Sequence, residues 1–169
     1  PQLIEETLSD DSENESKKLN NLISLAKEKY SIDGLVHGGI LSEYQKDNFS
    51  LICEKNQLKI ISPLWNKEPE SYMKELLNEN FEYIISTVSS AGLNDSWLGR
   101  IIDKNGLDEL QKLQKKFRFN LNFEGGEAET FVTNCPLFEK RLLIQDSTTE
   151  WDGYRGRFEI LEAKLKDNA

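Results

Sequence analysis

The sequence lacks the features that mark several large classes of protein. Its two cysteines, Cys53 and Cys135, are too few and too far apart for a disulfide framework or a zinc site. A catalytic cysteine would need a base, and the single histidine, His37, lies in a strand-like run and is a poor candidate for that base. We therefore interpret both cysteines as buried structural thiols. No apolar run approaches the roughly 20 residues that span a bilayer, and no signal-peptide pattern opens the chain. We therefore expect a reduced, cytoplasmic protein, and we assign no metal ligand.

Positive charge is also scarce. The 169 residues include 21 Lys and Arg against 30 Asp and Glu, a net charge of −9 at pH 7. Nucleic acids and anionic membranes attract clustered basic residues, so neither is an expected partner. The three Trp, five Tyr and eight Phe argue against disorder and supply a core for one ordinary domain or two small ones.

The first half of the chain alternates helical and strand-like patterns. From Leu19, apolar residues recur at the spacing of one helix face, and residues 31–41, 57–64 and 81–89 form short apolar runs. A capping-box pattern predicts a helix from Ser42 to about residue 56, and a third helix follows around residues 68–81. This alternation predicts parallel strands joined by right-handed crossovers, which bind ligands beyond their carboxyl ends.

The composition shifts after Ser90. Residues 92–117 predict one or two helices, and the remainder reads as short strands with loops. We therefore expect a boundary between a domain at 1–89 and a smaller, mixed α/β lobe at 90–169.

The loop after the first predicted strand is a weak candidate for a nucleotide site. No glycine-rich phosphate loop of a known type occurs in the sequence. The pair Gly38 and Gly39 is weak evidence, because paired glycines are common in turns. Ser42, Tyr44 and Gln45 offer hydrogen bonds just past the strand end, where a ligand would bind. Ordinary helix capping explains Ser42 and Gln45 equally well.

Residues 123–132, FEGGEAETFV, concentrate negative charge beside two glycines. If the segment is extended, Glu127 and Glu129 share one face, and Ala128 and Thr130 share the other. Like charges near a core repel and resist desolvation, and a cation between them relieves both costs. That cation could be ammonium, a quaternary amine or Mg²⁺. The alternative is a solvated strand end with a glycine turn.

Residues 92–100, GLNDSWLGR, form a second candidate. The run 94–96 can cap a following helix, and Trp97 and Arg100 are three apart and share a face. Arg100 could bind a phosphate or a carboxylate through bidentate hydrogen bonds. The alternative is a capped helix with Trp97 in the core and Arg100 on the surface.

Taken together, these blocks resemble the diphthine–ammonia ligase family, ATP-dependent amide-forming enzymes of the PP-loop, adenine-nucleotide alpha-hydrolase type. The similarity extends from about Pro1 to Lys140. The blocks that carry it, in order, are GGILSEYQK, PLW, GLNDSWLGR and EGGEAETFV.

The resemblance implies a fold and a reaction. The fold is the C-terminal part of a Rossmann-like (HUP-type) parallel-sheet domain, which binds the nucleotide, followed by a smaller mixed α/β substrate lobe. ATP, with Mg²⁺, activates the carboxylate of diphthine on elongation factor 2 as an acyl-adenylate, and ammonia then forms the amide of diphthamide. The partners implied are elongation factor 2 in its diphthine form and ammonia or ammonium, and the assembly we consider is a homodimer.

The resemblance also assigns residues. One acidic side chain would bind or deprotonate ammonium, with Trp97 or Phe123 as an aromatic wall. The catalytic residues it implies are Glu124, Glu127, Glu129 and Thr130. The substrate-binding residues are Gly92, Trp97, Gly99, Arg100, Gly125 and Gly126, and the nucleotide-binding residues are Gly38, Gly39, Ser42, Tyr44 and Gln45.

Two departures from the family pattern matter. The family's S-G-G-K-D-S phosphate loop lies upstream of the segment that matches Pro1 and is missing here, and Asn48 stands where relatives commonly have arginine. We expect the chain to be a fragment of a longer ligase that does not bind ATP tightly by itself. The alternatives are a non-catalytic paralogue or binding module that recognises elongation factor 2 or an adenine nucleotide, and a plain scaffold domain.

Overall fold

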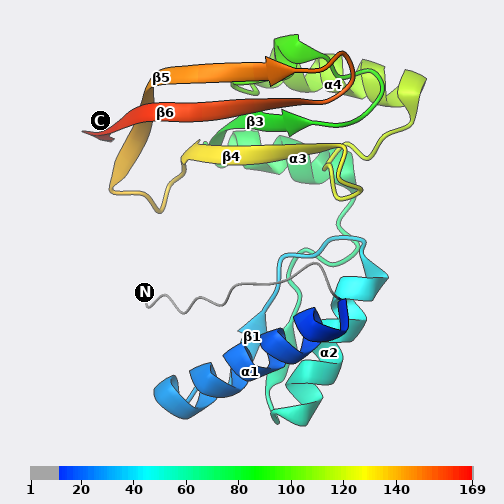
Figure 1. The fold of residues 1–169 in the computed structure, drawn as a ribbon, viewed down its shortest axis with the longest axis vertical. Coiled ribbons are helices and arrows are strands. Elements are labelled where there is room, and N and C mark those ends of the chain that lie inside the picture. The colour runs from blue at the N-terminus through cyan, green and yellow to red at the C-terminus, as the bar shows by residue number, and fades with distance from the viewer. Residues whose placement is uncertain (1–11, 169) are drawn as a thin grey trace. The chain divides into compact units, whose positions relative to one another are not determined.

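A computed structural model of the chain describes residues 12–168 (Figure 1). Its contacts divide the chain into two compact units, unit 1 (Pro1–Lys67) and unit 2 (Glu68–Ala169). This division lies earlier in the chain than the expected boundary at 89–90. The reason is that α3 (Pro69–Asn78) and β3 (Glu82–Val88) share a core and a sheet with later elements.

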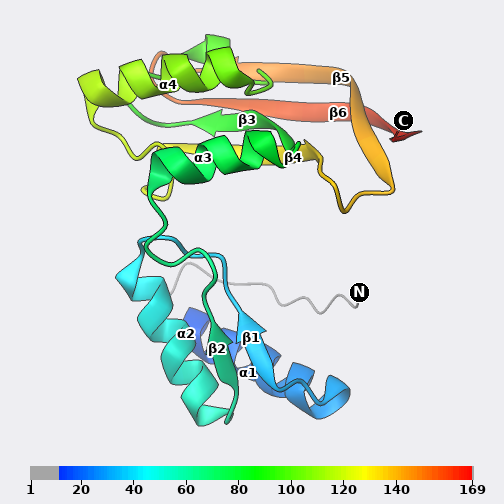
Figure 2. The same ribbon diagram turned by 180° about the vertical axis from the view of Figure 1, so that it is seen from behind.

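Unit 1 has the predicted order of helix, strand, helix and strand. Its elements are α1 (Ser12–Tyr30), β1 (Gly34–Val36), α2 (Glu43–Lys55) and β2 (Lys59–Ile61). β1 and β2 pair in parallel (Figure 2), which confirms this part of the predicted topology.

The core of unit 1 is small. Ile23 of α1 packs with Ile52 and Cys53 of α2 and with Leu58, which leads into β2. Burial raises the pKa of the Cys53 thiol, and Cys135 in unit 2 is also free and buried. Both cysteines are therefore buried free thiols, as the sequence predicted.

α2 begins and ends as predicted. Ser42 is its N-cap, and the Ser42 hydroxyl accepts a hydrogen bond from the Gln45 backbone N–H at 3.4 Å. Asn56 is the C-cap, and its backbone N–H donates to the Ile52 carbonyl at 3.1 Å. The capping-box pattern therefore predicted the start of this helix, and the expected end near residue 56 is also confirmed.

Unit 2 is a four-stranded antiparallel sheet with helices on one face. The strands lie in the order β4-β3-β6-β5, and every neighbouring pair is antiparallel. Figures 1 and 2 show α3 and α4 covering the same face of this sheet. The elements not yet bounded are the 3-10 helix η1 (Asp95–Trp97), α4 (Lys104–Phe117), β4 (Ala128–Asn134), β5 (Lys140–Trp151) and β6 (Gly156–Asp167).

The prediction that β3 continues a parallel sheet is wrong. β3 pairs antiparallel with both β4 and β6. Ile84 and Ile85 point to opposite faces, yet they are only 1% and 0% exposed. A strand buried on both faces reads as a continuous apolar run whatever its direction, so the sequence pattern could not distinguish the two sheets. The architecture is mixed α/β, with a parallel pair in unit 1 and an antiparallel sheet in unit 2.

The segment after η1 extends the sheet of unit 2 along β3. The Gly99 N–H donates to the Ile85 carbonyl at 2.8 Å, and the Ile102 N–H donates to the Tyr83 carbonyl at 3.0 Å. The motif at 92–100 is therefore fixed against the central strand. Within residues 12–168, no helix is both long and apolar enough to cross a bilayer.

Candidate functional site

The loop that follows β3 and the glycine turn that precedes β4 meet at one end of the unit 2 sheet. The loop after β3 begins at Ser89, whose backbone N–H donates to the Glu127 carbonyl at 2.8 Å. The Ser89 hydroxyl also donates to the Gly126 carbonyl. These bonds join the start of the loop that leads to residues 92–100 to the glycine turn that precedes β4.

In the glycine turn, the Glu127 carboxylate lies close to the backbone of Gly125. The Gly126 N–H donates to the Phe123 carbonyl at 3.0 Å, and Gly126 has a φ of 77°, which favours glycine. A Cβ at Gly125 would lie 2.6 Å from Glu127 Oε1. One glycine therefore provides the backbone conformation, and the other leaves room for the Glu127 carboxylate.

Glu127 is held at one oxygen and unpaired at the other. Its Oε1 accepts a hydrogen bond from the Asn120 backbone N–H at 2.8 Å. Its Oε2 is buried and has no hydrogen-bond partner within residues 12–168, and neither amide atom of the Asn122 side chain has one. A buried carboxylate oxygen without a donor is costly. A positively charged N–H donor at this position would remove that cost.

The other predicted catalytic residues do not converge on one point. Glu124 is half-buried in the same turn as Glu127. Glu129 lies opposite Thr87 on β3, whereas Thr130 lies opposite Ile85, which faces the helices. The expected alternation is therefore present, and it places the exposed Glu129 and Thr130 side chains on opposite faces of the sheet.

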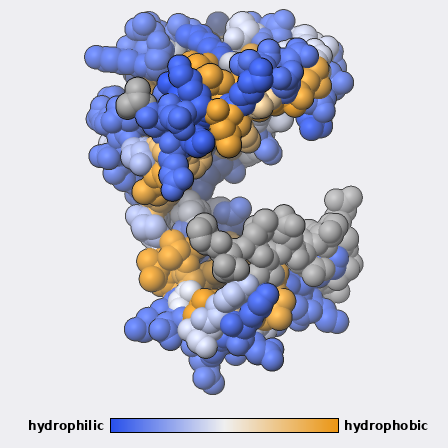
Figure 3. Space-filling view, turned by 90° about the vertical axis from the view of Figure 1, so that its left-hand side faces the viewer, coloured by the Kyte–Doolittle hydropathy of each residue, from blue (hydrophilic) through white to orange (hydrophobic). Residues whose placement is uncertain are grey.

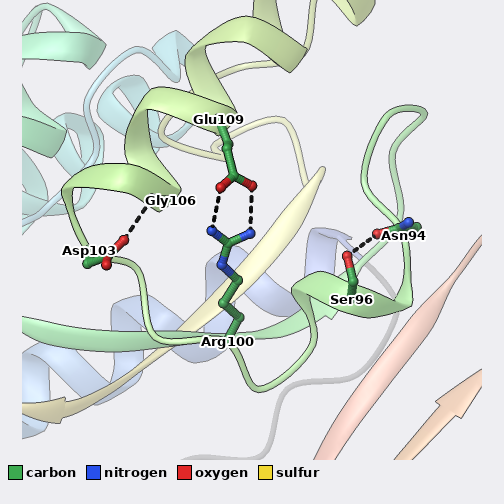
Figure 4. Close-up of polar contacts among 6 residues, drawn as sticks. All are labelled: Asn94, Ser96, Arg100, Asp103, Gly106 and Glu109. Atoms are coloured by element: carbon green, nitrogen blue, oxygen red, sulfur yellow. Dashed lines mark hydrogen bonds and ion pairs between the residues drawn. The ribbon is translucent and has the colours of Figure 1, made fainter.

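Arg100 already forms a bidentate ion pair with Glu109 (Figure 4). Its Nη1 and Nη2 donate to the Glu109 carboxylate at 2.8 Å and 2.9 Å, and its guanidinium lies 4.4 Å from the centre of the Trp97 ring. The hydrogen bond raises the pKa of Arg100 and lowers the pKa of Glu109. A phosphate or carboxylate ligand would have to displace Glu109.

The two aromatic side chains predicted to form a wall of the site, Trp97 and Phe123, lie in the core of unit 2. Trp97 is 4% exposed and Phe123 is 6% exposed, so neither presents an open aromatic wall to solvent. Gly92 and Gly99, two of the predicted substrate-binding glycines, pack against aromatic rings. A Cβ at Gly92 would meet the Phe117 ring, and a Cβ at Gly99 would meet the Phe158 ring.

The helix after this motif is capped by a residue that the sequence reasoning missed. Asn94, one of the predicted caps, is the N-cap residue of η1, but its side chain makes no capping bond and instead accepts from the Ser96 hydroxyl at 2.6 Å (Figure 4). α4 is instead capped by Asp103, whose Oδ1 accepts from the Gly106 N–H at 2.7 Å. The pattern of an acidic residue just before an apolar stripe could have identified Asp103.

In unit 1, His37 organises the loop after β1. His37 is buried, its Nδ1 accepts a hydrogen bond from the Gly39 N–H at 3.2 Å, and its ring stacks on Phe49 at 5.2 Å. Because Nδ1 accepts, the neutral ring carries its proton on Nε2, which lies 2.7 Å from the Ser62 hydroxyl. His37 therefore joins the ends of the two parallel strands.

The predicted nucleotide residues lie in this loop and in the first turn of α2. The Gly39 N–H is bonded to His37, the Ser42 hydroxyl caps α2, and Gln45 lies against Gly39. Tyr44 is 63% exposed, and a Cβ at Gly38 would meet nothing within 4 Å. That N–H and that hydroxyl are therefore already engaged within unit 1. No group of three or more metal-ligating side chains occurs in the described part of the chain.

Comparison with known proteins identifies the family. The family model described as "Diphthamide synthase C-terminal domain" matches residues 68–165, which is nearly the whole of unit 2. The chain is 35% identical over 134 residues to the diphthine–ammonia ligase of Bos taurus and 34% identical over 134 residues to that of Homo sapiens. It is 28% identical over 171 residues to the diphthine–ammonia ligase of Saccharomyces cerevisiae.

These relatives are longer than the matched region. The bovine and human alignments cover 79% of this chain and 50% of each relative, and the yeast alignment covers 91% of this chain and 24% of the relative. The chain therefore spans about half the length of the mammalian proteins that it resembles. The family match covers more than half of the chain, so the chain belongs to the diphthamide synthase family and carries the family's C-terminal domain in unit 2.

Proposed function

We propose that this chain is part of a diphthine–ammonia ligase that converts diphthine on elongation factor 2 to diphthamide. Its family and the names of its relatives support this assignment. In the reaction, the diphthine carboxylate attacks the α-phosphorus of ATP and pyrophosphate leaves. Ammonia then attacks the acyl-adenylate, AMP leaves, and the amide forms. The reaction takes place in the cytoplasm.

Glu127 is the residue that we assign to ammonium. The observation that carries this assignment is the Glu127 Oε2 atom, which is buried without a donor while Oε1 is fixed by the Asn120 N–H. Ammonium offers several N–H donors and a positive charge, which together match an acceptor-only carboxylate. Glu127 would hold the ammonium ion and accept one of its protons, which leaves ammonia with a free lone pair to attack the acyl-adenylate.

The remaining assigned residues act around Glu127. Gly125 and Gly126 form the turn that holds its carboxylate, and Glu124 and Glu129 add negative charge that attracts ammonium and the trimethylammonium group of diphthine. The loop at 92–100 is the substrate loop, in which Gly92, Trp97, Gly99 and Arg100 set the backbone path. Thr130, the fourth residue of the proposed catalytic set, lies on the helix-facing side of β4, on the opposite face from Glu129.

ATP with Mg²⁺ supplies the activation chemistry in the complete enzyme. Gly38, Gly39, Ser42, Tyr44 and Gln45 contribute the edge of a Rossmann-like nucleotide site. Because the Gly39 N–H and the Ser42 hydroxyl are already engaged, the phosphates would be held by the S-G-G-K-D-S loop that the resemblance implies for the longer ligase. The 169-residue chain alone should bind ATP weakly or not at all in calorimetry with Mg²⁺.

An amidation assay tests this function. The complete ligase that contains this chain is incubated with diphthine-form elongation factor 2, ATP, Mg²⁺ and ¹⁵N-ammonium, and the product is analysed by mass spectrometry. We expect ¹⁵N in the diphthamide amide. Glu127→Gln should sharply reduce incorporation, whereas Glu139→Gln, at an exposed glutamate after β4, should not. Absence of incorporation by the unaltered ligase would contradict the proposed reaction.

A binding module is the second candidate, because the Gly39 N–H and the Ser42 hydroxyl are already engaged. On this alternative, the complete protein binds elongation factor 2 or an adenine nucleotide and forms no amide. The amidation assay separates the two candidates, with a pull-down of elongation factor 2 as the second readout.

A further inference from the structure

A row of polar side chains crosses the sheet of unit 2 at the end where the glycine turn lies. The strand register places four residues side by side, one on each strand: Glu129 on β4, Thr87 on β3, Arg157 on β6 and Glu150 on β5. Figure 1 shows that β3 ends, β4 begins and β5 turns into β6 at this same end of the sheet. Residues that are direct cross-strand neighbours project to the same face, so Arg157 lies between two acidic side chains in one row.

The row lies on the face of the sheet opposite α3 and α4. The adjacent row contains Val88 and Ala128, which are buried in the core that the sheet shares with these helices. Successive residues of a strand point to opposite faces, so Arg157 and its row point away from that core. This face of the sheet is turned to the viewer in Figure 1, and both helices lie behind it.

A pocket of about 370 Å³ lies at the turn between β5 and β6. Its lining includes Glu150 and Arg157 of the row, together with Asp152 and Arg155 of the turn. Asp152 is engaged by the turn, because its Oδ1 accepts from the Arg155 backbone N–H at 2.6 Å. The other three charged side chains are exposed, and none of them forms an ion pair with any residue that the structure describes. Two guanidinium groups and one carboxylate can therefore meet a ligand.

Charges of both signs distinguish this pocket from an apolar cavity of unit 2. That cavity has a volume of about 310 Å³, and Ile84, Leu142 and Phe158 are among its lining residues. Apolar residues also form a band between hydrophilic ones on the upper body in Figure 3. The pocket at the β5–β6 turn is instead suited to a charged ligand.

We propose that this pocket binds a compact zwitterion, with its carboxylate against Arg155 and Arg157 and its cationic group against Glu150. Guanidinium groups bind carboxylates through bidentate hydrogen bonds, and an exposed carboxylate attracts a cation. A simple anion is repelled by Glu150 and Asp152, and a simple cation is repelled by the two arginines. A ligand that carries both charges is therefore favoured over either one.

The zwitterion is the side chain of diphthine, which carries a carboxylate and a trimethylammonium group, an assignment that rests on the proposed function. Arg157 then holds the carboxylate that ATP activates. The Cα atoms of Arg157 and Glu129 are two strand spacings apart, about 10 Å, so the carboxylate lies at the same end of the sheet as the acidic motif.

Nuclear magnetic resonance on the isotope-labelled full chain tests this proposal. The probe is 2-(trimethylammonio)butanoate, which carries both groups on one carbon. Two matched controls each remove one charge: the methyl ester of the probe, and an analogue with a tert-butyl group in place of trimethylammonium. We expect saturable shifts at the Nε–H groups of Arg155 and Arg157 with the probe, and about fivefold weaker binding of each control.

Variants test the two halves of the pocket separately. Arg157→Gln should weaken binding of the probe about fivefold, whereas Arg118→Gln, at an exposed arginine outside the pocket, should leave it unchanged. Glu150→Gln should weaken binding of the probe and strengthen binding of the tert-butyl analogue, because Glu150 attracts the cation and repels the lone anion. A purely structural role of Glu150 would not produce these opposite changes.

The pocket and the proposed function can fail independently. A lack of saturable shifts at the pocket, equal binding of the probe and the tert-butyl analogue, or unchanged binding in Arg157→Gln would overturn the pocket proposal, even if the complete ligase forms the amide. If the probe binds as expected and the complete ligase incorporates no ¹⁵N, the zwitterion site is supported and the proposed function is wrong.

Discussion

The strands of unit 1 and unit 2 are buried to different extents. In unit 2, Ile84 and Ile85 of β3 are almost fully buried, at 1% and 0% exposure. In unit 1, Val36 of β1 and Ile61 of β2 are 63% and 50% exposed. Parallel strands are normally covered on both faces, and isolated pairs of short strands are marginally stable. The difference indicates that, among the described residues, the sheet of unit 2 is well covered, whereas the sheet of unit 1 is partly open.

Separating the units should give the largest effect. A fragment of residues 68–169 should unfold cooperatively in urea, because it retains the sheet and both covering helices. A fragment of residues 1–67 should show no cooperative transition, because its two strands have three residues each. Circular dichroism during urea titration measures both, and a cooperative transition in the shorter fragment would remove the contrast between the units.

Truncation of a buried isoleucine should affect the two units unequally. Ile85→Ala should lower the free energy of unfolding of unit 2 by about 4 kcal/mol, because a fully buried side chain leaves a cavity. Ile52→Ala in unit 1 should cost about 2 kcal/mol, since a small core collapses more readily around the lost atoms. Hydrogen exchange, which reports each unit separately, measures both values. Equal losses would show that the two cores are equally rigid.

Removal of a helix cap should also destabilise unit 2 more than unit 1, but by smaller free energies than truncation of a buried isoleucine. Asp103 accepts from the Gly106 N–H at 2.7 Å, whereas Ser42 accepts from the Gln45 N–H at 3.4 Å. Asp103→Ala should therefore cost about 1 kcal/mol and Ser42→Ala about 0.5 kcal/mol. Urea unfolding of the two variants measures this, and a larger loss for Ser42→Ala would mean that the loop after β1 is held more firmly than its geometry indicates.

The exposed ion pair of unit 2 should give the smallest effect. The hydrogen bond from Arg100 lowers the pKa of Glu109 below its ordinary value. Its stabilisation is therefore present above that ordinary pKa and is lost as the pH falls through the lowered one. Glu109→Gln should be slightly less stable than the unaltered chain at pH 7, and the two should converge in acid. A difference that persists in acid would point to a contact other than the ion pair.

Local patterns were enough to predict most of the elements. The Ser42 cap, Pro69 in the first turn of α3 and the parallel pairing of β1 with β2 all follow from residues close together in the sequence. The direction of β3 could not be predicted, because its partners β4 and β6 lie far along the chain and its apolar run fits either kind of sheet.

The candidate site was predictable in part. The glycine turn and the alternation of Glu129 and Thr130 followed from residue types and spacing. The bond from the Asn120 N–H to Glu127 and the pairing of Arg100 with Glu109 were not predicted, because each depends on the path of a loop. Arg141 and Glu82 are 59 residues apart, so their contact needed the tertiary structure.

Separating the two half-reactions of the complete ligase tests the central claim most directly. Exchange of pyrophosphate into ATP reports carboxylate activation, and amide formation against ammonium concentration reports ammonia capture. If Glu127 binds ammonium, Glu127→Gln leaves the exchange rate nearly unchanged and lowers kcat/KM for ammonium by roughly 10- to 100-fold, the value of a charge-assisted hydrogen bond. An unchanged kcat/KM for ammonium, or an equal loss in both half-reactions, would contradict the account.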